Sequence, residues 1–267
     1  MPTVLITGCS SGIGRLTTQR FAAHGWNVAA TARHPETLAA LEAPNVAALA
    51  LDVTDEASIA RAVAATVERF GTIDVLVNNA GYGVFGPLEA MSAGQLEQQF
   101  KVNVFGLAAV TRHVLPVMRR QHRGTIVNVS SLGGRFGSPF FSAYYSSKHA
   151  VEGLSESLRY ELKAHGIRVK LIEPAHFKTG FISSLEWVTL SSYEPQIDTM
   201  KSWVVHQDRK APPADPIAEM VFKAATDPSD RLRYPVRGRI ALAIHAVLPD
   251  AVWRAMMGAG MSRRPRS

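Results

Sequence analysis

The sequence predicts an α/β protein built as one doubly wound domain, in which a parallel sheet of about seven strands carries helices on both faces. Apolar runs of strand length alternate with amphipathic runs of helix length along most of the chain. Parallel neighbours need crossover connections, which the intervening helices supply. No linker, repeat or low-complexity tract interrupts the 267 residues. Because one core can extend to about 250–300 residues, we expect a single domain over 1–267.

The individual elements follow from the period of the apolar residues. The expected strands are Thr3–Thr7, Asn27–Ala32, Val46–Leu51, Val75–Asn78, Thr125–Val129, Arg168–Glu173 and Arg231–Val236. The expected helices are Gly14–His24, Glu36–Glu42, Ala57–Phe70, Ala93–Arg120, Ala143–His165, Asp215–Ala225 and closing helical material at Ile240–Ala259. Residues 175–215 form an irregular stretch rich in bulky side chains. Such long loops are usually functional or mobile, and we interpret this one as a substrate lid.

Composition and charge narrow the classes of function. The chain is 46% hydrophobic and 19% charged, as in a folded globular protein. Its net charge of +7 raises the question of nucleic-acid binding, but no basic cluster with interleaved aromatics is present, and we expect no nucleic-acid partner. The densest basic runs, Met118–Arg123 and Ser262–Ser267, are interpreted as a solvated helix end and a terminus. Contact with phosphate or anionic lipid is the weaker alternative.

The cysteine count and the apolar segments bear on the compartment. Cys9 is the only cysteine, which excludes an intrachain disulfide and suits a reducing cytosol. The chain starts directly with a strand, without a signal-like segment, so we expect a cytoplasmic protein. Ile240–Leu248 is far shorter than the roughly 18–20 residues needed to cross a bilayer, and we expect no transmembrane segment. An amphipathic helix that lies on a membrane or closes a pocket remains open there.

A glycine-rich loop follows the first expected strand. It reads Gly8-Cys9-Ser10-Ser11-Gly12-Ile13-Gly14, and a helix begins directly after it. Small residues at this point permit a tight turn, close approach of backbone N–H groups to a pyrophosphate, and tight packing of the helix on the strand. The glycine spacing differs from the pattern G-x-G-x-x-G. Its position between the first strand and the first helix predicts a dinucleotide site.

The end of the second strand indicates which dinucleotide binds. An acidic residue there usually holds the ribose 2′-OH of NAD, whereas a 2′-phosphate requires a cation. This segment contains no Asp or Glu, and it ends at Ala32-Arg33-His34. The planar donor fork of Arg33 suits a phosphate. We therefore expect NADP(H) to be preferred over NAD(H), and we expect no metal.

Tyr144 and Lys148 lie four residues apart in an expected helix, which places them on one face. Hydride transfer belongs to the coenzyme, and the protein must supply orientation and a proton. We expect the ammonium, together with the positive charge of an oxidised nicotinamide, to lower the pKa of the phenol toward neutrality. Tyr145 lies three residues from Lys148, so helix geometry alone also admits it. Ser131 follows the strand Thr125–Val129, at the edge where ligands bind in such sheets.

These motifs together resemble those of the short-chain dehydrogenase/reductase family, which has a Rossmann fold. The resemblance spans about residues 3–180 and rests on Thr7-Gly8-x-x-x-Gly12-Ile13-Gly14, Asn78-Asn79-Ala80-Gly81 and Tyr144-x-x-x-Lys148. It selects Tyr144 as the acid/base and gives Lys148 a second contact, to the nicotinamide ribose. It implies that Ser131, thirteen residues before Tyr144, binds the substrate oxygen.

The resemblance extends to further positions of the coenzyme site. The implied coenzyme contacts include Asp52 and Val53 at the adenine, Asn79, Ala80 and Gly81 beside the adenosine, and Pro174 and Thr179 at the nicotinamide. Asp52 is alternatively a turn or N-cap residue. Asn103 matches a family residue that kinks its helix and holds a water of the proton relay. In Pro174-Ala175-x-x-x-Thr179 alanine replaces the family glycine, and it would be strained if that position needed a positive φ.

The resemblance also suggests a substrate class. The segments 81–89 and 173–179 are similar to those of 17β-hydroxysteroid and retinol dehydrogenases, so we expect a hydrophobic alcohol or its carbonyl form as substrate. Phe140 and Phe141 are candidate pocket walls, while Trp187 and Trp203 fit either the lid or the core. The family implies a homodimer or homotetramer through two long helices. The main alternative is a catalytically silent NADP(H)-sensing protein, and an epimerase or dehydratase is disfavoured by the glycine spacing.

Overall fold

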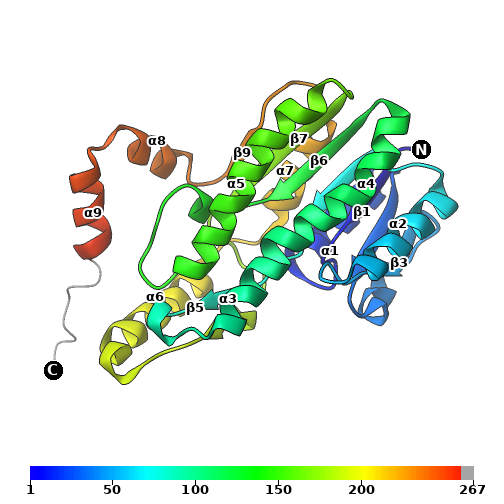
Figure 1. Ribbon diagram of the computed structural model, residues 1–267. Coiled ribbons are helices and arrows are strands. Elements are labelled where there is room, and N and C mark those ends of the chain that lie inside the picture. The colour runs from blue at the N-terminus through cyan, green and yellow to red at the C-terminus, as the bar shows by residue number, and fades with distance from the viewer. Residues whose placement is uncertain (260–267) are drawn as a thin grey trace.

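A seven-stranded parallel sheet forms the centre of the computed structural model, which describes residues 1–259 (Figure 1). Its strand order is β3-β2-β1-β4-β6-β7-β9. The strands are β1 (Thr3–Ile6), β2 (Asn27–Ala32), β3 (Val46–Ala50), β4 (Val75–Asn78), β6 (Gly124–Val129), β7 (Ile167–Pro174) and β9 (Arg233–Val236). The order reverses between β1 and β4, which creates the crevice where such sheets bind ligands. The expected doubly wound fold and its seven strands are confirmed.

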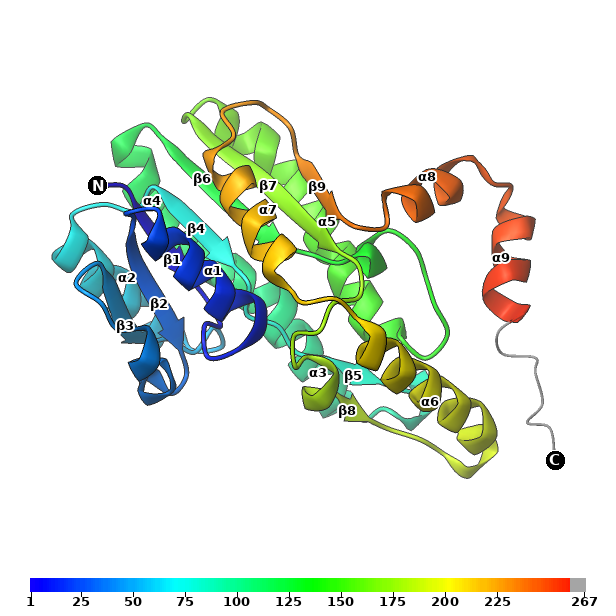
Figure 2. The same ribbon diagram turned by 180° about the vertical axis from the view of Figure 1, so that it is seen from behind.

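Helices cover both faces of the sheet. Figure 1 shows α2 (Glu56–Phe70), α4 (Leu107–Gln121) and α5 (Ser142–Lys163) on one face. Figure 2 shows α1 (Gly12–Ala23) and α7 (Asp215–Thr226) on the other. The alternation of side chains along each strand feeds both layers: Val4 and Ile6 pack under α1 and α7, whereas Leu5 packs under α2 and α4. Strands buried on both faces explain the continuous apolar runs in the sequence.

Local sequence signals fix several element ends. Asp55 caps the start of α2, where its carboxylate accepts a hydrogen bond from the Ala57 N–H at 2.9 Å. Gly71 ends the same helix in the left-handed region, with φ +78°. Ser92 and Gln95 form a reciprocal capping box at the start of α3 (Ala93–Phe100). These caps place α2 and α3 close to their expected starts.

The expected single helix Ala93–Arg120 is interrupted. After α3 the chain forms a π-helical turn, η3 (Lys101–Gly106), before α4 begins. A π turn adds a residue to the repeat and rotates the side chains that follow it. Here it directs the Asn103 amide to Tyr82 and Ser147. Gly106 lies so close to Val53 that a Cβ at this position would approach the Val53 side chain to 2.8 Å. Helical periodicity in sequence does not separate an α turn from a π turn.

Two further expectations are corrected. The expected helix Glu36–Glu42 is a 3-10 helix, η1 (Pro35–Leu41), because the short link between β2 and β3 opens with a proline that fixes φ. The expected irregular stretch 175–215 contains much regular structure: η5 (Ile182–Ser184), β8 (Glu186–Trp187), η6 (Ser191–Tyr193) and α6 (Glu194–Lys210). Ile197 and Val204 are buried seven residues apart on α6, a helical signal that the polar neighbours obscured.

The remaining elements lie around the crevice and at the C-terminal end. They are β5 (Val84–Phe85), η2 (Leu88–Ala90), η4 (Leu132–Gly134), α8 (Arg239–Val247) and α9 (Asp250–Ala259). β5 pairs in parallel with β8 and joins the segment after β7 to the body of the protein. Within residues 1–259, no helix combines the length and the apolar character needed to span a membrane.

Candidate active site

The carboxyl ends of β1, β2, β4, β6 and β7 open into one large cavity of about 840 Å³. Its lining includes most of the residues singled out from the sequence: Gly8, Ser10, Ser11, Ile13, Arg33, Asp52, Val53, Asn79, Ala80, Gly81, Ser131, Tyr144, Lys148, Pro174 and Thr179. Gly12, Gly14 and Asn103 lie behind this surface. The topology therefore gathers residues that are up to 171 positions apart in the sequence at one site.

The glycine loop is packed too closely for side chains. Gly8 has φ +73°, and a Cβ there would approach the Ala80 Cα to 2.9 Å. Gly12 has φ +52°, and a Cβ would lie 2.7 Å from the Thr179 carbonyl oxygen. At Gly14 the nearest atom, the Gly8 carbonyl oxygen, would be only 2.2 Å away. The three glycines thus hold the start of α1 against the ends of β4 and β7, as a nucleotide loop requires.

Hydrogen bonds tie this loop to the end of β4. The Thr7 hydroxyl accepts from the backbone N–H groups of Asn79 and Ala80, each at 3.0 Å. The Asn79 amide donates to the carbonyl oxygens of Thr7 and Gly8 at 2.9 and 3.0 Å. The Ser11 side chain makes no capping bond, and the first turn of α1 carries no acidic residue. The backbone N–H groups in the first turn of α1 therefore have no side-chain cap, and no carboxylate of that turn would repel an anion. Both features fit a pyrophosphate.

Arg33 and Asp52 line the end of the cavity beside β2 and β3. Arg33 is exposed and forms no ion pair with any residue in the described range 1–259. Its guanidinium is therefore free to bind an anion. One oxygen of Asp52 accepts from the N–H and the hydroxyl of Thr54, both at 2.8 Å. Asp52 thus forms a turn, while Asp55 provides the N-cap of α2.

Ser131, Tyr144 and Lys148 line the same cavity on the β6 side. The Lys148 amine donates to the Val129 carbonyl oxygen at 2.9 Å and lies 5.7 Å from the centre of the Tyr144 ring. The Ser131 hydroxyl accepts from the Gly133 N–H at 3.0 Å, so it also caps η4. The adjacent Ser130 hydroxyl is buried and has no hydrogen-bond partner in residues 1–259.

In the chain alone, the pKa of Tyr144 lies above its ordinary value. Burial raises it above its ordinary value, the neighbouring Tyr145 raises it further, and a hydrogen bond with Ser131 opposes both. The rings of Phe85 and Phe181 lie 5.5 and 5.4 Å from that of Tyr144. This apolar enclosure disfavours the charged phenolate. The phenol is therefore protonated at neutral pH, as a proton donor must be.

The pKa of Lys148 is also shifted, in this case downward. Burial lowers the pKa of its amine to about 8, and the charge of Glu152, one helical turn further along α5, partly opposes this shift. Lys148 is only 6% exposed. Near neutral pH the amine is thus charged but close to its titration range.

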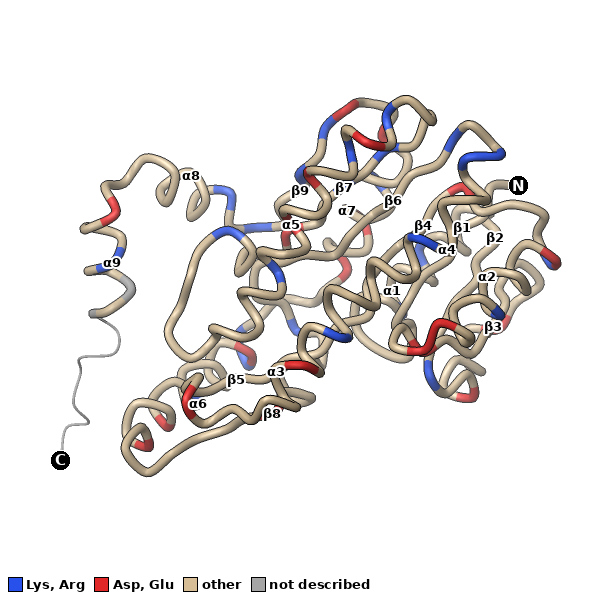
Figure 3. The backbone as a smooth tube through the Cα atoms, viewed as in Figure 1, with Lys and Arg blue, Asp and Glu red and all other residues tan. Residues whose placement is uncertain are grey.

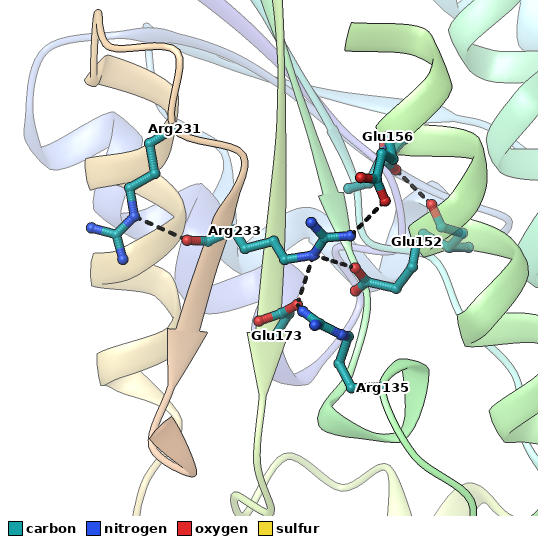
Figure 4. Close-up of polar contacts among 9 residues, drawn as sticks. Arg135, Glu152, Glu156, Glu173, Arg231 and Arg233 are labelled. Atoms are coloured by element: carbon teal, nitrogen blue, oxygen red, sulfur yellow. Dashed lines mark hydrogen bonds and ion pairs between the residues drawn. The ribbon is translucent and has the colours of Figure 1, made fainter. Parts of the chain in front are cut away.

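A network of ion pairs that was not found from the sequence joins Glu152, Glu173, Arg135 and Arg233 (Figure 4). Glu152 accepts from Arg233 at 3.1 Å, and Glu173 at the end of β7 accepts from Arg135 at 2.9 Å. Arg233 bridges the two carboxylates, since its Nε also lies 3.4 Å from Glu173. Burial and the charge of Glu173 raise the pKa of Glu152. The spacing of four residues between Lys148 and Glu152 was the available sequence signal.

Asn103 is a positioning residue in this structure. It is 1% exposed, its Oδ1 accepts from the Tyr82 N–H at 2.8 Å, and its Nδ2 donates to the Tyr82 carbonyl and the Ser147 hydroxyl, both at 3.0 Å. These bonds join η3 to the cavity wall and to α5, where Ser147 directly precedes Lys148. The helix irregularity implied by the family resemblance is present as the π turn.

The part of the cavity beside Tyr144 is walled by aromatic and aliphatic side chains. They are Phe85, Phe136, Phe141, Tyr145, Phe181, Ile182, Trp203 and Val204. Phe140 lies outside this wall and packs near Tyr193. Trp187 packs edge-on against Phe85 at 5.5 Å, whereas Trp203 lines the cavity and is 55% exposed.

The segment after β7 shows no backbone strain at Ala175. Ala175 does not have a positive φ, so alanine in place of the family glycine causes no conflict. Its N–H donates to the Val236 carbonyl oxygen at 3.1 Å. Thr179 packs against Gly12, and its hydroxyl accepts from the Phe181 N–H at 3.2 Å.

Residues 2–187 match the family described as short chain dehydrogenase. The chain belongs to this family. Its relatives include the uncharacterized oxidoreductase YusZ of Bacillus subtilis, 37% identical over 95% of this chain and 96% of YusZ. The 3-ketodihydrosphingosine reductase of Bacteroides thetaiotaomicron is 41% identical over 67% of this chain and 65% of that enzyme.

Solved structures of the family agree with the fold and with a nicotinamide site. A short-chain dehydrogenase from Streptomyces avermitilis has a TM-score of 0.82 and 32% identity, over 98% of this chain and 97% of that one. A family member from Burkholderia phymatum was solved with NAD (TM-score 0.80, 25% identity, 100% and 96% covered). ElxO was solved with NADP (TM-score 0.74, 26% identity, 90% and 99% covered). The chain is thus an oxidoreductase of a family whose members bind nicotinamide nucleotides.

Proposed function

We propose that this chain is an NADP(H)-dependent oxidoreductase that interconverts a lipophilic alcohol and its ketone or aldehyde. The observation that carries the proposal is the convergence of Ser131, Tyr144 and Lys148 on the cavity that the glycine loop also borders. An anion-binding loop and a proton donor beside a cation are the parts that this reaction needs.

The chain's own residues would orient the substrate and move a proton. The nicotinamide coenzyme, when bound, supplies or accepts the hydride. The Ser131 and Tyr144 hydroxyls would both hold the substrate oxygen. In the reducing direction Tyr144, protonated because of its burial, gives its proton to that oxygen as negative charge develops there. The Lys148 ammonium then stabilises the phenolate that remains, and its bond to the Val129 carbonyl fixes its position.

The coenzyme preference rests on Arg33. It is the only Lys or Arg besides Lys148 that lines the cavity in the described part of the chain, and Asp52 is the only carboxylate there. Because Asp52 is engaged with Thr54, Arg33 can bind a 2′-phosphate without competition. The dissociation constants of NADP(H) and NAD(H) test this directly: tighter NADP(H) binding is expected, and equal or reversed affinities would overturn it.

The substrate proposal rests on the apolar wall and on the absence of a second cation. No lysine or arginine of residues 1–259 lines the substrate end beyond Lys148, so a carboxylate or phosphate on the substrate would be unpaired. A neutral, hydrophobic substrate such as a steroid, a retinoid or a long-chain ketone fits this wall. A screen that includes short polar alcohols tests it, and exclusive turnover of the polar set would reject it. The segment 175–215 would act as a lid.

A coenzyme-sensing protein without activity is the alternative. It is disfavoured because the Tyr144–Lys148 pair is intact and faces the cavity. Replacing Tyr144 by Phe separates the two functions. An enzyme loses turnover and still binds coenzyme, whereas a sensor is unaffected.

We further propose a cytoplasmic homodimer or homotetramer. Cys9 is buried, which raises the pKa of its thiol to about 11 and leaves it unreactive. The outer faces of α4 and α5 are the proposed subunit contact, and light scattering measures the oligomeric state. A monomer would reject this assembly.

A further inference from the structure

The last two helices form an arm outside the layered body of the protein. After β9 the chain leaves the sheet, and α8 and α9 stand apart from the sheet and its covering helices in both views (Figures 1 and 2). Neither helix contributes to the core clusters of the fold. Since these two helices do not stabilise the core, we looked at what else their surface could bind.

The outer surface of this arm is apolar. On α8, Ile240, Ile244 and Val247 follow each other at a spacing of four and three residues and are 78%, 39% and 79% exposed. On α9, Val252 and Met256 are four residues apart and are 45% and 56% exposed. This spacing places each set on one side of its helix. Contiguous apolar stripes of this kind mark an interaction surface, whereas single exposed residues do not.

The inner side of the arm is attached to the rim of the cavity. His245 of α8 and Trp253 of α9 contact each other, with ring centroids 4.7 Å apart. Both also contact Phe136, at 5.7 and 5.3 Å, and Phe136 lines the cavity. Whatever binds the outer side of the arm is therefore held next to the cavity mouth.

The charge of this region identifies the kind of partner. Residues 239–267 contain five arginines and one aspartate, a net side-chain charge of +4 out of +7 for the whole chain. Arg239 belongs to α8 and Arg254 to α9, where Arg254 also pairs with Asp250 at 3.1 Å. Figure 3 shows basic positions in blue at the start of α8 and on α9. Arg263, Arg264 and Arg266 lie outside the described residues. A second copy of this arm carries the same positive charge, so contact between two arms would bring like charges together. An anionic lipid surface offers apolar depth and the opposite charge.

We propose that the α8–α9 arm docks this protein on anionic membrane surfaces, with its apolar stripes at the level of the acyl chains and its arginines at the lipid headgroups. The docking is peripheral, since neither helix is long enough to span a bilayer. It places the cavity mouth at the lipid interface. The docking does not depend on the reaction proposed above, so either can fail without the other.

Vesicle flotation of the purified full chain tests this docking. We expect binding to phosphatidylcholine vesicles that contain about 30% phosphatidylglycerol, weaker binding to phosphatidylcholine alone, and loss of binding as salt rises from about 0.05 to 0.5 M. Replacing Ile240 and Val247 together by Ser should reduce the fraction bound by about tenfold or more. Leu88→Ser is the matched control, because Leu88 is 57% exposed outside the arm, and it should bind as the wild type does.

Wild-type protein that fails to bind anionic vesicles, or a double variant that binds as well as the wild type, would overturn the proposal. Light scattering tests whether the arm instead contacts a second copy of the chain. The arm is a subunit contact if the wild type does not bind vesicles and the double variant forms a smaller oligomer than the wild type. Circular dichroism of both variants verifies folding, which these exposed side chains should not affect.

Discussion

Replacing Lys148 by Met is expected to stabilise the coenzyme-free chain at neutral pH, although it removes a proposed catalytic residue. Lys148 is 6% exposed, and burial lowers the pKa of its amine from 10.5 to about 8. At about 1.4 kcal/mol for each pKa unit, the buried charge destabilises the fold by roughly 3 kcal/mol below pH 8. The variant avoids this cost, but it also loses the hydrogen bond to the Val129 carbonyl, which stabilises the wild type by about 1 kcal/mol. The net stabilisation is about 2 kcal/mol.

The sign of this effect depends on pH. Between pH 8 and 10.5 the unfolded chain holds the Lys148 proton and the folded chain does not, so the free energy of unfolding of the wild type rises with pH. The advantage of the variant should therefore be complete at pH 7 and reverse slightly near pH 10.5, where only the lost hydrogen bond remains.

Urea denaturation at pH 7 and at pH 10 measures the difference. Lys163→Met is the matched control, because its side chain lies on the same helix and is 76% exposed. The control should show no comparable pH dependence. A Lys148→Met chain that is less stable than the wild type at pH 7, or a difference that is constant with pH, would refute the reasoning.

Three further changes test the architecture around the site. Glu152→Gln removes the carboxylate that raises the pKa of Lys148, so the alkaline limb of the kcat/KM profile should move to lower pH; an unmoved limb would show that the two groups are uncoupled. Gly14→Ala places a Cβ 2.2 Å from a backbone oxygen and should destabilise the fold by about 1–3 kcal/mol in urea, whereas Gly153→Ala, which meets no atom within 4 Å, should stabilise α5 by about 0.5–1 kcal/mol. Tyr82→Phe removes the hydroxyl that donates to a β8 carboxylate, and hydrogen exchange of the β8 amides should become about tenfold faster; unchanged exchange would show that this bond does not hold the lid segment.

The sheet could be predicted from the sequence because each strand is a continuous apolar run between turn residues. The glycine loop and the Tyr144–Lys148 pair were equally accessible, since both depend on spacing within one segment. The parallel topology then brings them together without further information. Local pattern and overall topology agree most closely at this edge of the sheet.

Other features depend on contacts that no local pattern encodes. The π turn at Asn103 is stabilised by partners 21 and 44 residues away, and the network around Arg233 joins three segments that are distant in sequence. The helix α6 was missed because its buried side is narrow. Burial raises the pKa of Tyr144 in the chain alone, and the aromatic side chains that enclose it come from β5 and the segment after β7, which its own helix does not reveal.

The most direct test of the account compares turnover in Tyr144→Phe and Tyr145→Phe, with the NADP(H) dissociation constant measured on the same preparations. Both variants remove one hydroxyl from adjacent cavity-lining rings. If Tyr144 is the proton donor, its variant should lose about 10²–10⁴-fold in kcat with unchanged coenzyme affinity, while the Tyr145 variant keeps at least about a tenth of wild-type turnover. Equal losses in the two variants, or full turnover without the Tyr144 hydroxyl, would contradict the account.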